Sequence, residues 1–366
     1  MKSLLILTAG FGEGHNAAAR NLREAIAVMA PQTNAVVSDV FLDAYGSFNR
    51  LVQQGYVAVI NRFPSLWQMV FEILDRTRIV EWHIGVYAAA ARRLSGLISN
   101  LEPSVIVSTY PGCNHLLDFI YRRRLKRPFR MVTIITDSLT INSVWHRAHS
   151  DYFLVANEPT ANVLVDAGIP QQKIRVFGFP VPRLFGSLNG SRPVPPPDGR
   201  WRVLYVINSG RAMAPEIVRR LLALDDVRLT VTTGRDEDLA RRLSAISKAE
   251  RKSIDVFGWT PEMPRLMVEN HLLISKAGGA TVQETLAART PMIITQIVPG
   301  QEEGNARLVL ERRAGALATT PPRIAATTRA AFADGAREWI AWQQAASSLS
   351  RPNAADDIAR FLLGSL

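Results

Sequence analysis

The sequence predicts an α/β protein built from two successive halves, each with its own parallel sheet. Short apolar runs alternate with helical patterns through most of the 366 residues, which is typical of parallel βαβ units. A proline-rich break separates two such series, with four prolines in the five positions 193–197. The length is sufficient for two domains with separate hydrophobic cores.

The first half contains six apolar runs that we expect to form strands. Each is short, rich in Val, Ile and Leu, and bounded by polar or turn residues, as buried strands of a parallel sheet are. In order they are SLLILTA (3–9), NAVVSDV (34–40), SVIVSTY (104–110), RMVTIITD (130–137), DYFLVAN (151–157) and KIRVFGF (173–179). Between the second and the third lies a long, mostly helical region, residues 45–99.

The second half restarts the same alternation after the prolines. Its expected strands are RVLYVINSG (202–210), VRLTVTTG (227–234), SIDVFGW (253–259), HLLISKAGG (271–279) and PMIITQIV (291–298). Prolines cannot continue a helix or a ladder, so the domain boundary is placed among them. We therefore expect a first domain at 1–185, a linker at 186–200, a second domain at 201–330, and C-terminal helices at 331–366 that pack back on the first domain.

The amino-acid composition indicates what kind of partner the protein binds and in which cellular compartment it works. Lys and Arg outnumber Asp and Glu by 43 to 32, a net charge of +11 that favours an anionic partner. A single cysteine, Cys113, fits a reducing compartment. No apolar stretch reaches membrane-spanning length, and the apolar N-terminus continues directly into a glycine turn and helix, so it is interpreted as a buried strand. We expect a cytoplasmic protein whose membrane contact is peripheral.

The densest motif of the second half follows its fourth strand. In SKAGGATVQETL, Lys276, Gly278 and Gly279 precede a helix expected to begin near Thr281. Glycines there allow a ligand close to the backbone, and helix N-terminal amides point at an anion. Glu284 has two interpretations: a capping box with Thr281, or a carboxylate that accepts from ribose hydroxyls.

A polar run, IVPGQEEGNA, follows the last of these strands. Gly300, Gln301, Glu302 and Asn305 fall at the carboxyl end of a strand, where ligands of α/β proteins bind. Side chains that both donate and accept suit the hydroxyls of a sugar. A solvated loop is the plain alternative.

The first strand runs into the turn GFGEGHN, which places His15 at the start of a helix. An unperturbed imidazole is largely neutral at cytoplasmic pH and can accept a proton. Gly12 and Gly14 remove side chains that would keep a substrate from the ring. The alternative is that His15 only caps or packs the helix.

In these motifs the chain resembles the family-28 glycosyltransferases. SKAGGATVQETLAARTPMIITQIVPGQEEGNA, preceded by FGWTPEMPRLM, resembles their donor half, and GFGEGHNAAARNLREAI and VFGFPVPRLF resemble their first half. The similarity is to monogalactosyldiacylglycerol synthases and processive diacylglycerol glucosyltransferases over roughly residues 3–318. The resemblance implies the GT-B fold, in which two Rossmann-like domains face across a cleft. It also implies inverting transfer of a hexose from a UDP-sugar to diacylglycerol at a membrane surface, with no metal or other cofactor.

The resemblance assigns His15 as the base that deprotonates the acceptor hydroxyl. It assigns Glu284 to the ribose. It assigns the diphosphate to Gly278, Gly279, Ala280 and Thr281, beside Lys276. Gln301, Glu302 and Asn305, after Gly300, would face the sugar and the acceptor side. Gly258, Trp259 and Met263 would border the uracil, and Gly12 and Gly14 would face the sugar. Ser209 and Gly210 stand where the family has a glycine-rich turn, and Ile141 and Asn142 stand where it has a histidine, so both places depart from the family pattern.

Aromatic and basic residues gather in the expected acceptor domain. Region 45–99 interleaves aromatics with arginines, and YRRRLKRPFR (121–130) adds six positive charges. This combination suits a lipid interface with anionic headgroups, although a core stripe with solvated arginines is the alternative. The expected membrane and acceptor residues are Trp67, Trp82, Arg122, Arg123, Arg124 and Lys126.

Several alternatives stay open. Transfer could go to a polyprenyl-linked or hydroxylated lipid, the protein could be a UDP-sugar sensor, or it could be an epimerase on the same fold. No nucleic-acid motif accompanies the charge. His146 and His149 lack an acidic or sulfur partner that would complete a metal site, so none is expected.

Overall fold

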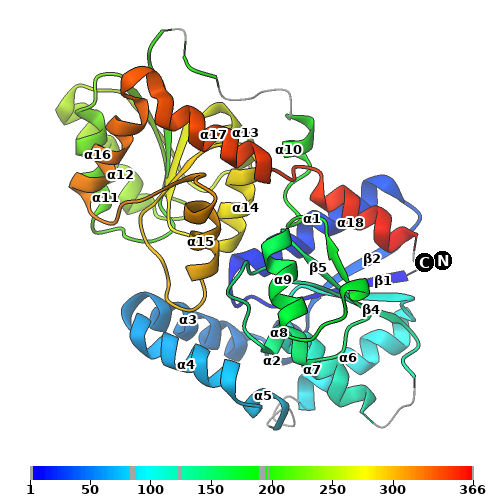
Figure 1. Cartoon of the computed structure of the whole chain (residues 1–366). Helices are drawn as coiled ribbons and strands as arrows, with labels where there is room; N and C mark the ends of the chain where they lie inside the picture. The colour runs from blue at the N-terminus through cyan, green and yellow to red at the C-terminus, as the bar shows by residue number, and fades with distance from the viewer. Residues whose placement is uncertain (1–2, 83–87, 123–125, 189–193, 197, 365–366) are drawn as a thin grey trace. The chain divides into compact units, whose positions relative to one another are not determined.

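The computed structural model describes residues 3–82, 88–122, 126–188, 194–196 and 198–364 (Figure 1). The chain forms two compact units. Unit 1 comprises Met1–Arg183, Val298–Gly304 and Asn353–Leu366; unit 2 comprises Leu184–Ile297 and Asn305–Pro352. The expected segment 331–366 is therefore shared between the units. A seven-residue segment from the polar run after the last expected strand belongs to unit 1.

Unit 1 has a six-stranded parallel sheet with the order β2-β1-β3-β4-β5-β6. Its strands are β1 (Ser3–Thr8), β2 (Asn34–Asp39), β3 (Val105–Ser108), β4 (Arg130–Ile134), β5 (Tyr152–Val155) and β6 (Ile174–Val176). Each lies within an apolar run that the sequence predicted. Its helices are α1 (Glu13–Met29), α2 (Val40–Tyr45), α3 (Ser47–Arg62), α4 (Pro64–Arg76), α5 (Ile79–Trp82), α6 (Ala88–Leu101), α7 (Pro111–Tyr121), α8 (Val144–Arg147), α9 (Glu158–Asp166) and α18 (Ala354–Leu363).

Alternate residues of β1 build two separate cores, one on each face of the sheet. Leu4 and Ile6 pack with α1 and α18, whereas Leu5 and Leu7 pack with α2, α6 and α7. All four side chains are fully buried. The two-residue period of a strand thus explains why helices cover both faces.

The C-terminal helix α18 lies beside α1 in unit 1 (Figure 1). Ile358 is fully buried in the core on that face, and Arg183 donates two hydrogen bonds to the Asp356 carboxylate. Truncation of Ile358 would leave a cavity between α18 and the sheet.

Ile358→Ala is expected to destabilise unit 1 by about 2–5 kcal/mol, because the lost methyl groups leave an unfilled space. Urea unfolding followed by circular dichroism measures the change. The exposed neighbour Arg360→Ala is the matched control and should shift stability by less than about 0.5 kcal/mol. Equal effects of the two variants would contradict the packing of Ile358 against the sheet.

Unit 2 contains a second six-stranded parallel sheet, with the order β12-β11-β10-β7-β8-β9. Its strands are β7 (Trp201–Val206), β8 (Val227–Thr232), β9 (Ile254–Phe257), β10 (Leu272–Ser275), β11 (Met292–Ile294) and β12 (Gly315–Leu317). Its helices are α10 (Leu184–Ser187), α11 (Ala214–Leu222), α12 (Glu237–Glu250), α13 (Met263–Glu269), α14 (Gly279–Ala287), α15 (Glu303–Glu311, which begins in unit 1), α16 (Pro321–Phe332) and α17 (Arg337–Leu349).

The last strand of unit 2 was not predicted. β12 has only three residues, too few for a periodic pattern, and it begins at Gly315. A side chain at Gly315 would overlap the Met292 carbonyl of the neighbouring strand β11. In the hydrophobic core of the same unit, the Trp201 ring stacks on the Phe332 ring with 4.3 Å between ring centres.

No helix in the described parts of the chain combines the length and the apolar character that crossing a bilayer requires.

Candidate active site

The site of unit 1 forms where three adjacent strands end. β1, β3 and β4 are neighbours in the sheet, so the residues that follow them meet at its carboxyl edge. β1 leads into the glycine turn and His15, β3 leads to Thr109 and Tyr110, and β4 leads to Thr136 and Asp137. The topology therefore gathers side chains that are more than a hundred positions apart in the chain.

His15 is held in one tautomer. Its Nδ1 lies 2.8 Å from the Thr109 carbonyl oxygen and 2.9 Å from Thr136 Oγ1. A carbonyl can only accept, so Nδ1 carries the hydrogen and Nε2 has the free lone pair. Nε2 has no hydrogen-bond partner in the described part of the chain. Burial lowers the pKa of His15 to about 4, with the Thr109 bond acting in the opposite direction, so the ring is neutral at pH 7.

The glycine turn is stabilised by a carboxylate. The Gly10 N–H and the Leu42 N–H each donate to Asp39, both at 2.9 Å. Gly12 has φ +130°, which only glycine adopts readily, and it precedes the first residue of α1 without a side-chain cap. Gly14 lies in the first turn of α1, one residue before His15. The turn therefore fixes where α1, and with it His15, begins.

A cavity of about 390 Å³ opens beside His15. Its walls come from the glycine turn, from α2 to α5, and from the residues that follow β3 and β4. Nearly half of its lining residues are Phe, Tyr or Trp, including Phe11, Phe41, Tyr56, Phe71, Tyr110 and Trp145. Such a cavity suits an apolar ligand with a few polar atoms.

Asp137 supplies a carboxyl group to the same cavity. Trp145 Nε1 donates to its Oδ2 at 2.8 Å, and burial raises the pKa of Asp137 to about 6. No sequence motif singled out this residue. The available signal was its place directly after a buried strand, at the edge where ligands of α/β folds bind.

The segment Val298–Gly304 brings one residue of the polar run to this cavity. Gln301 Oε1 accepts from the Tyr56 hydroxyl at 3.0 Å, and both side chains line the cavity. Glu302 instead turns inward: it is 5% exposed, and its Oε2 accepts from the Val298 N–H. Gly300 has φ +76° and lies against the Phe71 ring. Of these residues, Gln301 is the one that reaches the cavity.

Unit 2 presents its own polar cluster at the carboxyl edge of its sheet. Ser209 Oγ donates to Gln296 at 2.7 Å, and Asn208 lies 3.4 Å from Thr281 Oγ1. These residues follow β7, β11 and β10, which are close together in the sheet. Gly210 has φ +70° beside them, and Arg211 is paired with Asp236.

The helix after β10 begins earlier than expected, so the capping box is corrected. α14 starts at Gly279 with Gly278 before it, and Thr281 lies inside the first turn. A residue inside the first turn does not occupy the capping position. The backbone amides of Gly279, Ala280 and Thr281 lie in the first turn of this helix. Lys276 precedes the helix by three residues, and Glu284, about one turn further along, is half-buried. Asn305 is buried and donates to the Ala277 carbonyl at 3.3 Å.

Three further expected donor residues lie near the end of β9. Gly258 follows that strand, Trp259 is 69% exposed, and Met263 is the first residue of α13. A large exposed indole in a turn at this edge is available to a flat ligand.

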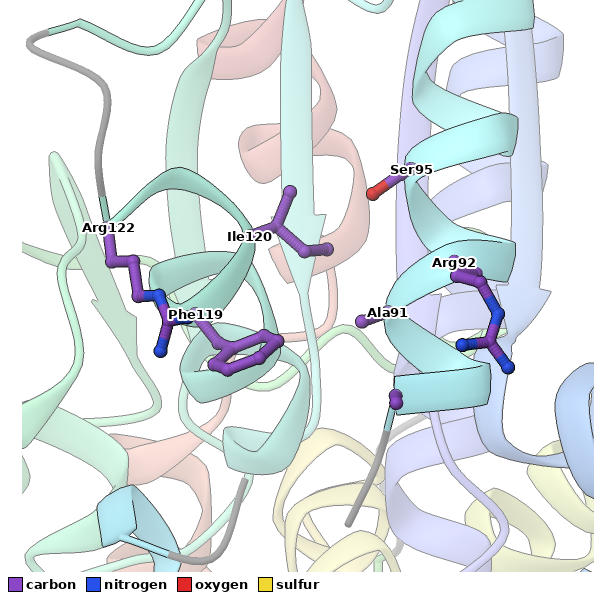
Figure 2. Close-up of a pocket in the computed structure, with 7 residues that line it drawn as sticks. Ala91, Arg92, Ser95, Phe119, Ile120 and Arg122 are labelled. Atoms are coloured by element: carbon purple, nitrogen blue, oxygen red, sulfur yellow. The ribbon is translucent and has the colours of Figure 1, made fainter. Parts of the chain in front are cut away.

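The expected membrane residues fall into three groups. Arg122 and Lys126 are exposed, and the Arg122 guanidinium lies 4.5 Å from the centre of the Phe119 ring. A hollow of about 500 Å³ lies there, with Phe119 and Ile120 of α7 opposite Ala91 and Ser95 of α6 (Figure 2). Trp67 lines the cavity beside His15. Arg123, Arg124 and the Trp82 side chain lie outside the described residues.

Exposed apolar side chains gather on the helices that surround the cavity. They are Phe48, Leu51, Val52, Phe63, Leu66, Met69, Ile73 and Ile79, on α3 to α5 and their connection. Of these, Phe48 and Val52 also line the cavity. Two hydrogen bonds connect α4 to the residues that follow β4. Asn142 Nδ2 donates to the Phe71 carbonyl at 3.0 Å, and the Ser143 N–H donates to Asp75. The surface formed by these eight residues is called the apolar surface below.

Two family models match the chain. One describes monogalactosyldiacylglycerol synthase and matches residues 15–181; the other describes the C-terminal domain of glycosyltransferase family 28 and matches residues 212–315. Monogalactosyldiacylglycerol synthase 3 of Arabidopsis thaliana is 27% identical over 98% of this chain and 80% of its own length. A processive diacylglycerol beta-glucosyltransferase of Bacillus thuringiensis is 23% identical over 98% of this chain and 93% of its own.

Solved structures show the fold. Acinetobacter baumannii MurG superimposes with a TM-score of 0.67 at 13% identity, over all of both chains. The UDP complex of S. aureus MnaA gives 0.62 at 12% identity, over 100% of this chain and 98% of the other. Together with the two parallel sheets, these similarities confirm the GT-B fold that the sequence predicted.

Proposed function

Because this chain belongs to the family-28 glycosyltransferases of the monogalactosyldiacylglycerol synthase and diacylglycerol glucosyltransferase type, we propose that it glycosylates diacylglycerol. The reaction is an inverting transfer of a hexose from a UDP-sugar to the lipid hydroxyl at a membrane surface. The observation that carries the proposal is the neutral, oriented His15 beside an apolar cavity.

His15 is the base in this proposal. Inversion requires that the acceptor hydroxyl lose its proton as the sugar is transferred, and Nε2 is the unprotonated nitrogen. When His15 takes the proton, it becomes positive in a low-dielectric cavity. The Asp137 carboxylate lines the same cavity and stabilises that charge.

Unit 2 holds the donor. The amides of Gly279, Ala280 and Thr281 bind the diphosphate at the start of α14, and Glu284 accepts from the ribose. Ser209 and Gly210 bind phosphate oxygens, and Trp259 packs near the uracil with Gly258 and Met263. Gln301 binds a sugar hydroxyl; Glu302 and Asn305 act indirectly, by shaping the segment around it.

The apolar surface on α3 to α5 is the membrane contact. Eight exposed large apolar side chains on adjacent helices form a patch that water solvates poorly. The net charge of +11, with Arg122 and Lys126 exposed on the same unit, favours an anionic lipid surface.

The test is incubation of the purified protein with a panel of UDP-sugars and diacylglycerol vesicles, followed by identification of products by mass. A hexosyl diacylglycerol is the expected product. Interconversion of UDP-sugars without any lipid would favour an epimerase. Binding of UDP-sugar without turnover, across all donors and lipids, would favour a sensor and contradict the proposal.

The pH profile tests whether the Asp137 carboxylate stabilises protonated His15 during turnover. The pKa of Asp137 is about 6 and that of His15 about 4, so lowering the pH protonates Asp137 first. We expect kcat/KM to fall below about pH 6 while His15 is still neutral. Asp137→Asn should lower the rate and remove this acid limb, leaving a fall nearer pH 4. An unchanged limb near pH 6 in Asp137→Asn would contradict the assignment.

A further inference from the structure

Among the described residues, two N–H donors in the cavity beside His15 have no partner. The Asn49 Nδ2 and the Trp67 Nε1 are both buried without a hydrogen bond to the described part of the chain, and both residues line the cavity. Asn49 is only 5% exposed. Buried donors are almost always paired in folded proteins, so these two indicate a ligand that supplies acceptors.

The Trp67 indole is held in a fixed orientation. Its ring packs edge-on against Tyr56, with 5.0 Å between centres and an angle of 89°. Tyr56 is in turn fixed by its hydrogen bond to Gln301. The Trp67 N–H is therefore a preorganised donor rather than one that can rotate to find solvent.

The chemistry of the missing partner follows from the lining. Indole N–H and amide NH₂ groups donate only, so the ligand atoms must be acceptors. No Lys or Arg lines the cavity in the part of the chain that the structure describes, which argues against a phosphate or free carboxylate. The acceptors that fit the cavity are therefore neutral carbonyl oxygens attached to an apolar body. An ester-linked lipid has one such oxygen in each acyl linkage.

Building on the proposed function, we propose that Asn49 and Trp67 bind the ester carbonyl oxygens of diacylglycerol and thereby select ester-linked over ether-linked acceptors. The free hydroxyl then faces His15 and Asp137 at the same cavity. About 390 Å³ cannot enclose two long acyl chains, so the chains leave past Phe48 and Val52. These two residues are 66% and 41% exposed and belong to the apolar surface, which gives the chains a continuous apolar path.

The test compares 1,2-diacylglycerol with 1,2-dialkylglycerol of equal chain length, mixed in the same vesicles with the active UDP-sugar. An ether lacks the carbonyl oxygen and keeps only a weaker acceptor in the bridging position, so its use would leave both donors without the acceptors proposed for them. We expect kcat/KM for the diacyl lipid to exceed that for the dialkyl lipid by about 10- to 100-fold, as for sites that lose a hydrogen-bonding group.

Two variants test whether Asn49 and Trp67 cause the preference for the diacyl over the dialkyl lipid. Asn49→Leu and Trp67→Phe keep the apolar packing and remove the N–H groups, so each should lower kcat/KM for the diacyl lipid. Their kcat/KM with the dialkyl lipid should not fall, because the ether lacks the carbonyl that these N–H groups bind, and circular dichroism checks that both variants are folded. Gln68→Leu, an exposed amide on α4, is the matched control and should retain the full preference.

The outcomes separate this inference from the proposed function. Equal use of the two lipids by the wild-type protein overturns the ester-binding role and leaves the glycosyltransferase proposal intact. A preference that survives in both variants also overturns it. Absence of any glycolipid from either acceptor overturns the proposed function, and this inference with it.

Discussion

His15→Ala should lower kcat by about 10²- to 10⁴-fold while leaving the affinity for UDP nearly unchanged. The ring is the one imidazole that lines the described cavity, and its Nδ1–H bond to Thr109 leaves Nε2 unprotonated. Alanine removes the proton acceptor, whereas the residues proposed to bind the nucleotide belong to unit 2. The loss should therefore fall on kcat rather than on nucleotide binding.

Turnover is measured with diacylglycerol vesicles, and UDP affinity by calorimetry. His149→Ala is the matched control, because this histidine is exposed and its Nε2 lies 3.4 Å from the Asp151 carboxylate, outside the residues that line the cavity. The control should keep near wild-type kcat. Comparable turnover in His15→Ala would remove the base from the proposed mechanism, and loss of UDP binding would show that the imidazole serves the donor.

The strands could be predicted because buried parallel strands leave a strong signal. β1 contains four consecutive fully buried aliphatic residues, Leu4 to Leu7, and β3 and β10 are likewise buried throughout. β2 and β9 are only partly buried, so for them the signal was the short apolar run between turn residues. β12 left no such signal, since it has three residues and takes its place only through pairing with β11. The start of α14 was misjudged because a Thr three residues before a Glu imitates a capping box, while glycine can begin a helix without a side-chain cap.

The site was predictable where one local motif carries it and not where distant segments meet. The glycine turn indicated His15 as a candidate site residue, and the polar run indicated Gln301. Both side chains line the cavity. Asn49 and Trp67 belong to α3 and α4, whose aromatic and basic pattern indicated a membrane surface and nothing about unpaired donors. Glu302 was expected at the sugar, but its carboxylate satisfies the Val298 N–H, a contact that a linear motif does not reveal.

Gly304→Ala should destabilise the protein by about 3 kcal/mol or more and lower kcat about a hundredfold. A Cβ at this position would overlap the Ser138 carbonyl oxygen and the Thr140 amide nitrogen. Both are backbone atoms, so no side-chain rotation relieves the overlap. The segment Val298–Gly304 must then move away from the residues that follow β4, and Gln301 moves with it out of the cavity that also holds Asp137.

Thermal unfolding and steady-state kinetics with a saturating UDP-sugar measure the two effects. Gly96→Ala is the control, because Gly96 is exposed on α6 with nothing within 4 Å of the added methyl group. Alanine there should stabilise the helix by up to about 1 kcal/mol and leave kcat unchanged. A Gly304→Ala protein as stable and active as wild type would mean that Val298–Gly304 does not rest on the loop after β4. Gln301 would then have no fixed place beside His15.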